Sequence, residues 1–195
     1  MKAYSELPEG YKEILSIDLQ KDKKLSAKIH ILALIIAVLA VVPMQFFVPA
    51  TELFSMEDLG LYSIRFVSIF VLIIVYMVLH EAVHGIAMKI CGTKKVKYGF
   101  TGSYAYAGST DFYDKSAYIF IALAPVVLWG IVLAAVCFFV PREWFWVVYF
   151  IEVNNLSGAA GDLYVTVRFS KLPKDILVRD HGVGMAVFSR EEDAR

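Results

Sequence analysis

Charged residues are scarce in this sequence. Asp, Glu, Lys and Arg make up 19% of the 195 residues, whereas hydrophobic residues make up 58%. A typical soluble chain has about 25% charged and about 45–50% apolar residues. The apolar excess is concentrated in long blocks, which indicates a membrane protein. The formal net charge is +0, so the charge balance does not favour a nucleic-acid partner.

Cysteine is equally rare. Cys91 and Cys137 are the only two in the sequence, and both lie in or beside apolar stretches. We expect them to be buried small hydrophobic residues rather than a disulfide or a zinc–thiolate site. A cleavable secretory signal is also not evident, because the first apolar block follows a lysine-bearing leader and no small-residue cleavage site comes after it. That block is therefore interpreted as a retained span.

Four apolar blocks are long enough to cross a bilayer, for which a helix needs about 20 residues. They cover residues 29–48, 64–90, 117–140 and 144–167, and the last is the most polar. The expected fold class is an α-helical membrane protein with about four transmembrane helices. We expect a single integral membrane domain over 1–195, in which a four-span core (29–167) follows a leader (1–28) and precedes a tail (168–195).

Lysine and arginine are concentrated in alternate segments between and around these blocks. They are abundant in the leader, in the loop after the second block and in the tail, whereas the loop after the first block carries acidic residues. The positive-inside rule then places both termini and the middle loop in the cytoplasm. An even number of spans agrees with this orientation.

Two segments outside the blocks have the pattern of β-hairpins. Residues 96–112 are rich in Tyr and Phe with Gly-Ser turns, and residues 176–188 place Asp-His-Gly between two short apolar runs. Both are predicted to be small cytoplasmic hairpins.

The motif HEAVH, at residues 80–84, is the strongest chemical signal. On a helix, His80 and His84 face one side and can bind one Zn²⁺, while Glu81 can act as general base on a metal-activated water. The alternative is a chance match on a solvated helix. The motif, however, continues an apolar span, where ionisable groups are costly unless they face a cavity and find partners.

A catalytic zinc usually has three protein ligands. Asp162 is the best third candidate, because an unpaired carboxylate in the last block would be costly. With the topology above, His80 lies about 24 Å and Asp162 about 27 Å along their helices from the outer face, at the helical rise per residue. His30 opens the first block and His181 lies in a predicted turn, so both are weaker candidates.

The last block holds other polar residues. Asn154 and Asn155 are candidates for interhelical hydrogen bonds, or for binding a substrate backbone or an oxyanion. Small residues at 157–161 fit close helix packing, which would also let ligands on two helices share a metal. Glu152 lies deeper in the membrane core and is a weaker ligand candidate. Its partner, like the role of the 96–112 hairpin, is not evident from the sequence.

With these residues in view, the chain resembles the zincin-peptidase family of small bacterial membrane proteins of unknown function. LPEGY, HEAVHG, KVKYGF, GDL and LPKDILVRDHG carry the resemblance, which extends over most of the chain. More distantly, it resembles the site-2 protease group of intramembrane zinc metalloproteases. By position, that second resemblance implies two zinc-binding histidines, a catalytic glutamate, a third ligand and an asparagine at His80, His84, Glu81, Asp162 and Asn154.

Two features depart from the site-2 pattern: no proline lies between Asn154 and Asp162, and Leu163 takes the place of a glycine. The resemblance also implies that a β element near the site holds substrate as an added strand, a part that residues 96–112 could play. A packed hairpin without a ligand is the alternative.

These observations lead to one principal expectation. The protein is a zinc-dependent, membrane-embedded peptidase of the bacterial cytoplasmic membrane, cutting membrane or membrane-associated proteins near the cytoplasmic face. Its expected partners are the lipid bilayer and a protein or peptide substrate, with no nucleic acid. A zincin cutting at the membrane surface, and a metal-binding scaffold or transport accessory without proteolytic activity, are the alternatives. Substrate identity and oligomeric state stay open.

Overall fold

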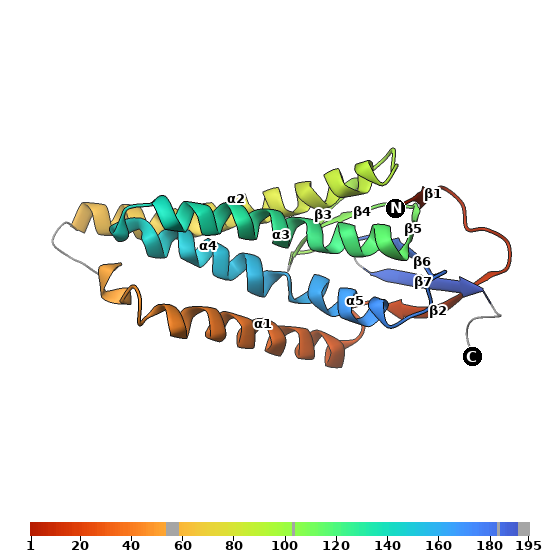
Figure 1. Cartoon of the computed structure of the whole chain (residues 1–195), viewed down its shortest axis with the longest axis horizontal. Helices are drawn as coiled ribbons and strands as arrows, with labels where there is room; N and C mark the ends of the chain where they lie inside the picture. Colours follow the sequence, from red (N-terminus) through yellow and green to blue (C-terminus); the bar gives the residue numbers. More distant parts are fainter. Residues whose placement is uncertain (54–58, 103, 183, 191–195) are drawn as a thin grey trace. The chain divides into compact units, whose positions relative to one another are not determined.

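The structure is a computed structural model that describes residues 1–53, 59–102, 104–182 and 184–190. Helices dominate this part of the chain, together with two antiparallel sheets (Figure 1). The helices are α1 (Lys23–Met44), α2 (Leu59–Ile90), α3 (Lys115–Phe139), α4 (Phe145–Gly158) and α5 (Ala160–Ser170), with short 3-10 turns at Ala50–Glu52 and Arg142–Trp144.

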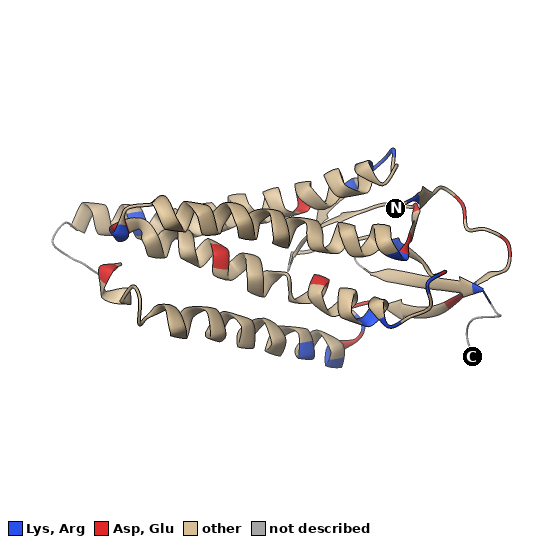
Figure 2. Ribbon diagram, in the orientation of Figure 1, with Lys and Arg blue, Asp and Glu red and all other residues tan. Residues whose placement is uncertain are grey.

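In the part of the chain that the structure describes, three helices are long and apolar enough to cross a membrane: α1, α2 and α3. They match the first three expected spans, and Figure 2 shows that charged residues are sparse along them. Their apolar side chains are widely exposed, as at Leu34 (64%), Leu39 (67%) and Ile131 (68%). Water would not favour so much exposed apolar surface, so these faces suit a lipid environment.

The structure differs from the prediction at the fourth span. Residues 145–170 form two helices, α4 and α5, of 14 and 11 residues, and each is shorter than a full span. The break lies at Ala159, whose φ of −77° and ψ of 10° leave the helical region. Glycine is a poor helix former and occurs on both sides of this residue, at Gly158 and Gly161. The described residues thus contain three uninterrupted candidate spans, whereas four were expected.

The contacts divide the chain into two compact units. The first unit combines residues 1–28, 81–125 and 162–195, and the second combines residues 29–80 and 126–161. Helix α2 is continuous through the boundary between His80 and Glu81.

A five-stranded antiparallel sheet dominates the first unit. Its strand order is β1-β5-β6-β7-β2, with bounds β1 (Ala3–Tyr4), β2 (Tyr11–Ile17), β5 (Phe112–Asp114), β6 (Leu177–Asp180) and β7 (Met185–Arg190). The hairpin expected over 176–188 is therefore present as β6–β7. The core beneath contains Tyr113, Phe169 and Ile176, none of which has measurable exposure (0%).

The leader, residues 1–28, contributes strand β2 to the five-stranded sheet. Strand β2 pairs with β7 along most of its length, from Tyr11 opposite Arg190 to Ile17 opposite Met185. From the sequence, residues 1–28 were interpreted as a cytoplasmic leader, and no strand was predicted there. The strand was missed because it is short and a bulge between Glu13 and Leu15 interrupts its alternation.

A second, two-stranded sheet lies in the same unit. It is the hairpin of β3 (Lys97–Phe100) and β4 (Ala105–Gly108), as expected for the 96–112 segment. Gly108 allows the backbone of this hairpin to approach the backbone of His181 closely, because a Cβ atom at residue 108 would lie 2.5 Å from the His181 carbonyl carbon. Only glycine permits such close backbone contact.

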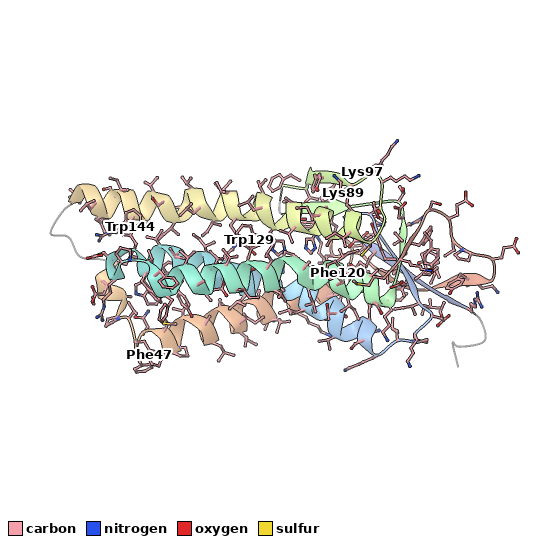
Figure 3. All side chains as sticks on the ribbon, turned by 45° about the horizontal axis from the view of Figure 1, so that its top comes forward. Phe47, Lys89, Lys97, Phe120, Trp129 and Trp144 are labelled. Carbon is pink, nitrogen blue, oxygen red and sulfur yellow. The ribbon has the colours of Figure 1, made fainter. Side chains whose placement is uncertain are left out.

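The second unit is held together by aromatic packing and by hydrogen bonds to backbone carbonyls. Trp146 is 1% exposed and donates to the Pro49 carbonyl at 3.2 Å. The Tyr149 hydroxyl donates to the Ala40 carbonyl at 2.8 Å. Trp129, labelled in Figure 3, packs edge-on against Tyr76, with ring centroids 6.2 Å apart.

Candidate metal centre

Helix α2 carries the HEAVH motif near its C-terminal end. His80 and His84 are one helical turn apart, so both side chains project from one face. Gly85 follows directly, and a Cβ atom there would collide with the Tyr98 hydroxyl of β3. The glycine therefore lets the hairpin approach α2 beside the motif.

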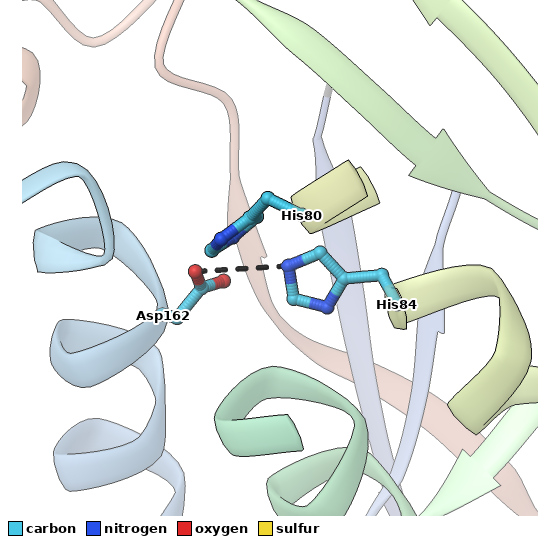
Figure 4. A group of neighbouring side chains, drawn as sticks. All are labelled: His80, His84 and Asp162. Atoms are coloured by element: carbon cyan, nitrogen blue, oxygen red, sulfur yellow. Dashed lines mark ion pairs between the residues drawn. The ribbon is translucent and has the colours of Figure 1, made fainter. Parts of the chain in front are cut away.

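Asp162 lies in the first turn of α5, just beyond the break at Ala159. His80, His84 and Asp162 each offer one ligand atom, and these atoms lie within 4.8 Å of one another (Figure 4). His84 Nε2 and Asp162 Oδ2 are 3.7 Å apart. The structure thus brings together the three residues that the sequence suggested as metal ligands.

A backbone contact sets the tautomer of His84. Its Nδ1 lies 2.9 Å from the carbonyl oxygen of Ile121. A carbonyl oxygen can only accept, so Nδ1 carries a hydrogen, and in the neutral imidazole Nε2 then keeps its lone pair. The lone pair belongs to the nitrogen that faces Asp162, which is the arrangement a metal-binding histidine needs.

The donor set fits zinc. A tetrahedral zinc with nitrogen and oxygen ligands at about 2.0–2.2 Å needs donor atoms about 3.4 Å apart. The 3.7 Å between His84 Nε2 and Asp162 Oδ2 is close to that separation, and the candidate ligand atoms of all three residues lie within 4.8 Å of one another. Two imidazoles and one carboxylate also leave a fourth position for water or substrate.

Glu81 is not one of the three grouped residues, although it lies among them in the sequence. Its carboxylate is within hydrogen-bonding reach of the backbone of Ala107 in β4 and interacts electrostatically with His84, Asp162 and Asp180. The carboxylate therefore lies beside the candidate ligands and next to the β3–β4 hairpin.

Asp180, at the end of β6, was not singled out from the sequence. Its Oδ2 accepts a hydrogen bond from the Tyr118 hydroxyl at 2.8 Å, and its Oδ1 accepts one from the Gly182 N–H, also at 2.8 Å. Burial raises the pKa of the Asp180 carboxyl, and these two donors partly offset the rise. The only signal in the sequence was the Asp-His-Gly turn, which gave no indication of its partner 62 residues earlier.

The two asparagines have different environments. Asn155 is fully buried (0% exposed) and makes several hydrogen bonds, whereas Asn154 is partly exposed. Glu152 is 8% exposed and has a partner in Asn155. His30 and His181 are exposed, and neither belongs to the grouped metal-ligand candidates among the described residues.

The helices and the site together define a class: a protein with several candidate membrane helices and a possible His-His-Asp metal site. Residues 73–177 match the family described as "Putative zincin peptidase", and this chain belongs to that family. The matched segment contains all three candidate ligands and Glu81. The description implies a zinc metallopeptidase, in agreement with the donor set.

A curated relative is the "Uncharacterized 24.7 kDa protein in gap 5'region" of Pyrococcus woesei. It is 31% identical over 121 residues, which cover 58% of this chain and 51% of that protein. The chain thus spans about half the length of this relative. No solved structure matches the chain.

Proposed function

We propose that this protein is a zinc-dependent, membrane-embedded peptidase of the bacterial cytoplasmic membrane. The observation that carries the proposal is the group of His80, His84 and Asp162 with Glu81 beside it. His80, His84 and Asp162 would hold the ion. Bound zinc would polarise the scissile carbonyl and activate a water molecule.

Glu81 has the position of a general base. Its carboxylate takes the proton of the attacking water and delivers it to the nitrogen of the leaving amine. A site that only stored or carried a metal would not need this carboxylate, so Glu81 favours a peptidase over a metal-binding scaffold or transport accessory.

The β3–β4 hairpin is the proposed substrate-holding element. Strand β4 pairs with β3 along one edge, and no strand among the described residues pairs with its other edge. Because Ala107 of β4 reaches Glu81, an extended peptide added beside β4 would lie near the general base. Main-chain hydrogen bonds would hold it with little dependence on sequence.

Sheet membership supports the proposed orientation. Strands from before α1, from between α2 and α3, and from after α5 all join one sheet. A bilayer cannot divide a hydrogen-bonded sheet, so these segments lie on one side, and their lysines and arginines favour the cytoplasm. Both termini are then cytoplasmic.

The same reasoning gives α4 and α5 a joint role. After α3 the chain has crossed three times, yet its tail returns to the sheet that contains the leader. We infer that α4 and α5 together make the fourth crossing, as one span broken at Ala159. Together they have 25 residues, or about 37 Å at the helical rise. Broken membrane helices are tolerated where the free backbone faces a polar site, and Asp162 directly follows this break.

Zinc content and cleavage test the proposal separately. We expect about one zinc per purified chain, nearly complete loss of zinc in His80→Ala and Asp162→Ala, and retained zinc without cleavage in Glu81→Gln. Proteomic comparison of cells with wild-type or Glu81→Gln protein would reveal uncut membrane proteins that accumulate. A wild-type protein without zinc would refute the metal site. Unchanged proteolysis in Glu81→Gln would remove Glu81 from the mechanism, and full zinc occupancy in both variants with no substrate in either proteome would favour the non-proteolytic alternative.

A further inference from the structure

A chain of buried polar side chains leads away from His80 within the second unit. His80 Nδ1 lies 2.7 Å from the Tyr76 hydroxyl, which lies 2.7 Å from Asn155 Oδ1. Asn155 Nδ2 lies 3.2 Å from both the Val126 carbonyl oxygen and Glu152 Oε2. The three side chains that follow His80 in this hydrogen-bond network are at least nine-tenths buried, with exposures of 5% for Tyr76, 0% for Asn155 and 8% for Glu152.

The donors and acceptors in this network can be assigned by starting from the Val126 carbonyl, at the end farthest from His80. The Val126 carbonyl can only accept, so the side-chain amide nitrogen of Asn155 must point to it. That nitrogen has a second hydrogen, which is donated to Glu152 Oε2. The two acceptors together therefore fix the side-chain amide, and Asn155 Oδ1 must face Tyr76.

Tyrosine has a single hydroxyl hydrogen. Asn155 Oδ1 carries none, so the Tyr76 hydroxyl donates its hydrogen to that atom. The tyrosine oxygen can then only accept from His80, and the hydrogen between the two residues must sit on His80 Nδ1. In the neutral imidazole the lone pair then lies on His80 Nε2, the form in which an imidazole binds a metal.

We propose that Tyr76, Asn155 and Glu152 are positioning residues for the metal centre, holding His80 in the tautomer and ring orientation that present Nε2 to the ion. This inference rests on the proposed zinc site. It also gives a role to Glu152, which the sequence left without a partner. A carboxyl group at this depth is costly, and here it accepts one of the two hydrogens that orient Asn155.

A buried polar network could also serve stability alone, so the test must separate stability from metal binding. Tyr76→Phe removes one hydroxyl and leaves His80 without its acceptor. Tyr149→Phe is the matched control, since it removes another hydroxyl of the same unit, bonded to the Ala40 carbonyl at 2.8 Å. Tyr76→Phe loses two hydrogen bonds, to His80 and to Asn155, and Tyr149→Phe loses one, but only Tyr76→Phe affects His80.

Zinc affinity is measured by competition with a chromophoric chelator on the purified full chain in detergent. Loss of an outer partner of a ligating histidine typically lowers metal affinity about 10–100-fold, so we expect that loss in Tyr76→Phe and less than about twofold change in Tyr149→Phe. Equal affinities in the wild type and Tyr76→Phe would overturn the inference while leaving the zinc site intact. A wild type that binds no zinc would instead overturn the proposed function on which the inference rests.

Two changes at Glu152 test the far end of the chain. Glu152→Gln keeps a side-chain oxygen that can accept from Asn155, so zinc affinity should stay within about threefold of wild type. Glu152→Leu removes the acceptor, frees the Asn155 side chain to rotate, and should lower affinity several-fold further. Equal affinity in the two variants would exclude Glu152 from the positioning role.

A metal-free readout completes the test. Histidine ¹³C and ¹⁵N chemical shifts of the chelator-treated protein distinguish the Nδ1–H from the Nε2–H tautomer. We expect His80 to be the Nδ1–H tautomer in the wild type and in Tyr149→Phe, and a mixture in Tyr76→Phe. An unchanged tautomer in Tyr76→Phe would contradict the proposal whatever the zinc affinity.

Discussion

The hydrogen bond between Tyr118 and Asp180 yields a pH-dependent stability prediction. Tyr118, in α3, is 3% exposed, and its hydroxyl donates to Asp180 Oδ2 at 2.8 Å. Tyr118→Phe removes this donor, whereas the hydrogen bond from the Gly182 N–H to the same carboxylate is retained. A hydrogen bond to a charged group contributes about 1.5–3 kcal/mol, and one between neutral groups about 1 kcal/mol.

The size of the effect therefore depends on the charge of Asp180. Burial raises the pKa of this carboxyl above its unfolded value. The folded protein then holds a proton that the unfolded chain releases, so this group's contribution to the free energy of unfolding falls as pH rises from about 4 through the folded pKa. Tyr118→Phe raises that pKa further, because the lost hydroxyl stabilised the charged form.

We expect Tyr118→Phe to destabilise the region around β6 by about 1 kcal/mol near pH 4, and by about 2–3 kcal/mol at pH 8. Hydrogen exchange of the β6 and β7 amides, followed by mass spectrometry on metal-free protein in detergent, measures this local free energy. In an Asp180→Asn background, the same substitution should have an effect independent of pH. A destabilisation that is constant or decreases with pH in the native background would show that Tyr118 does not stabilise the charged form of Asp180.

Two further predictions concern the hairpin and the membrane topology. Gly108→Ala should lower the free energy of unfolding by about 1–3 kcal/mol, as for other overpacked sites, because the new methyl group would meet the backbone of His181; an unchanged melting temperature would contradict the close contact. In a chain whose Cys91 and Cys137 are replaced by alanine, a membrane-impermeant maleimide added to intact cells should label Glu143→Cys and not Lys94→Cys. The reverse labelling would invert the proposed orientation.

Features that depend on neighbouring residues were predictable from the sequence. The three long apolar helices follow from the length of uninterrupted apolar blocks. The spacing of His80 and His84 places both side chains on one face of a helix. Both hairpins follow from turn residues between short apolar runs. Asp162 was identifiable because a carboxylate in an apolar block needs a partner.

Contacts between distant segments were decided by the tertiary structure. Tyr76 and Asn155 are 79 residues apart, and Tyr118 and Asp180 are 62 apart. No periodicity or motif encodes such pairings, since they depend on how the elements pack. The break at Ala159 likewise turned an expected fourth helix into two, and the pairing of β2 with β7 gave the leader a place in the sheet.

The chemical groups available to this protein can be identified from its sequence: two histidines and a glutamate at helical spacing in an apolar helix, and an aspartate in a later apolar segment. The tertiary structure decided which of these groups meet and which way their hydrogens point. A ligand's identity is local, but its tautomer depends on the acceptor that packing places against it. For His84 that acceptor is the Ile121 carbonyl, and for His80 it is the Tyr76 hydroxyl.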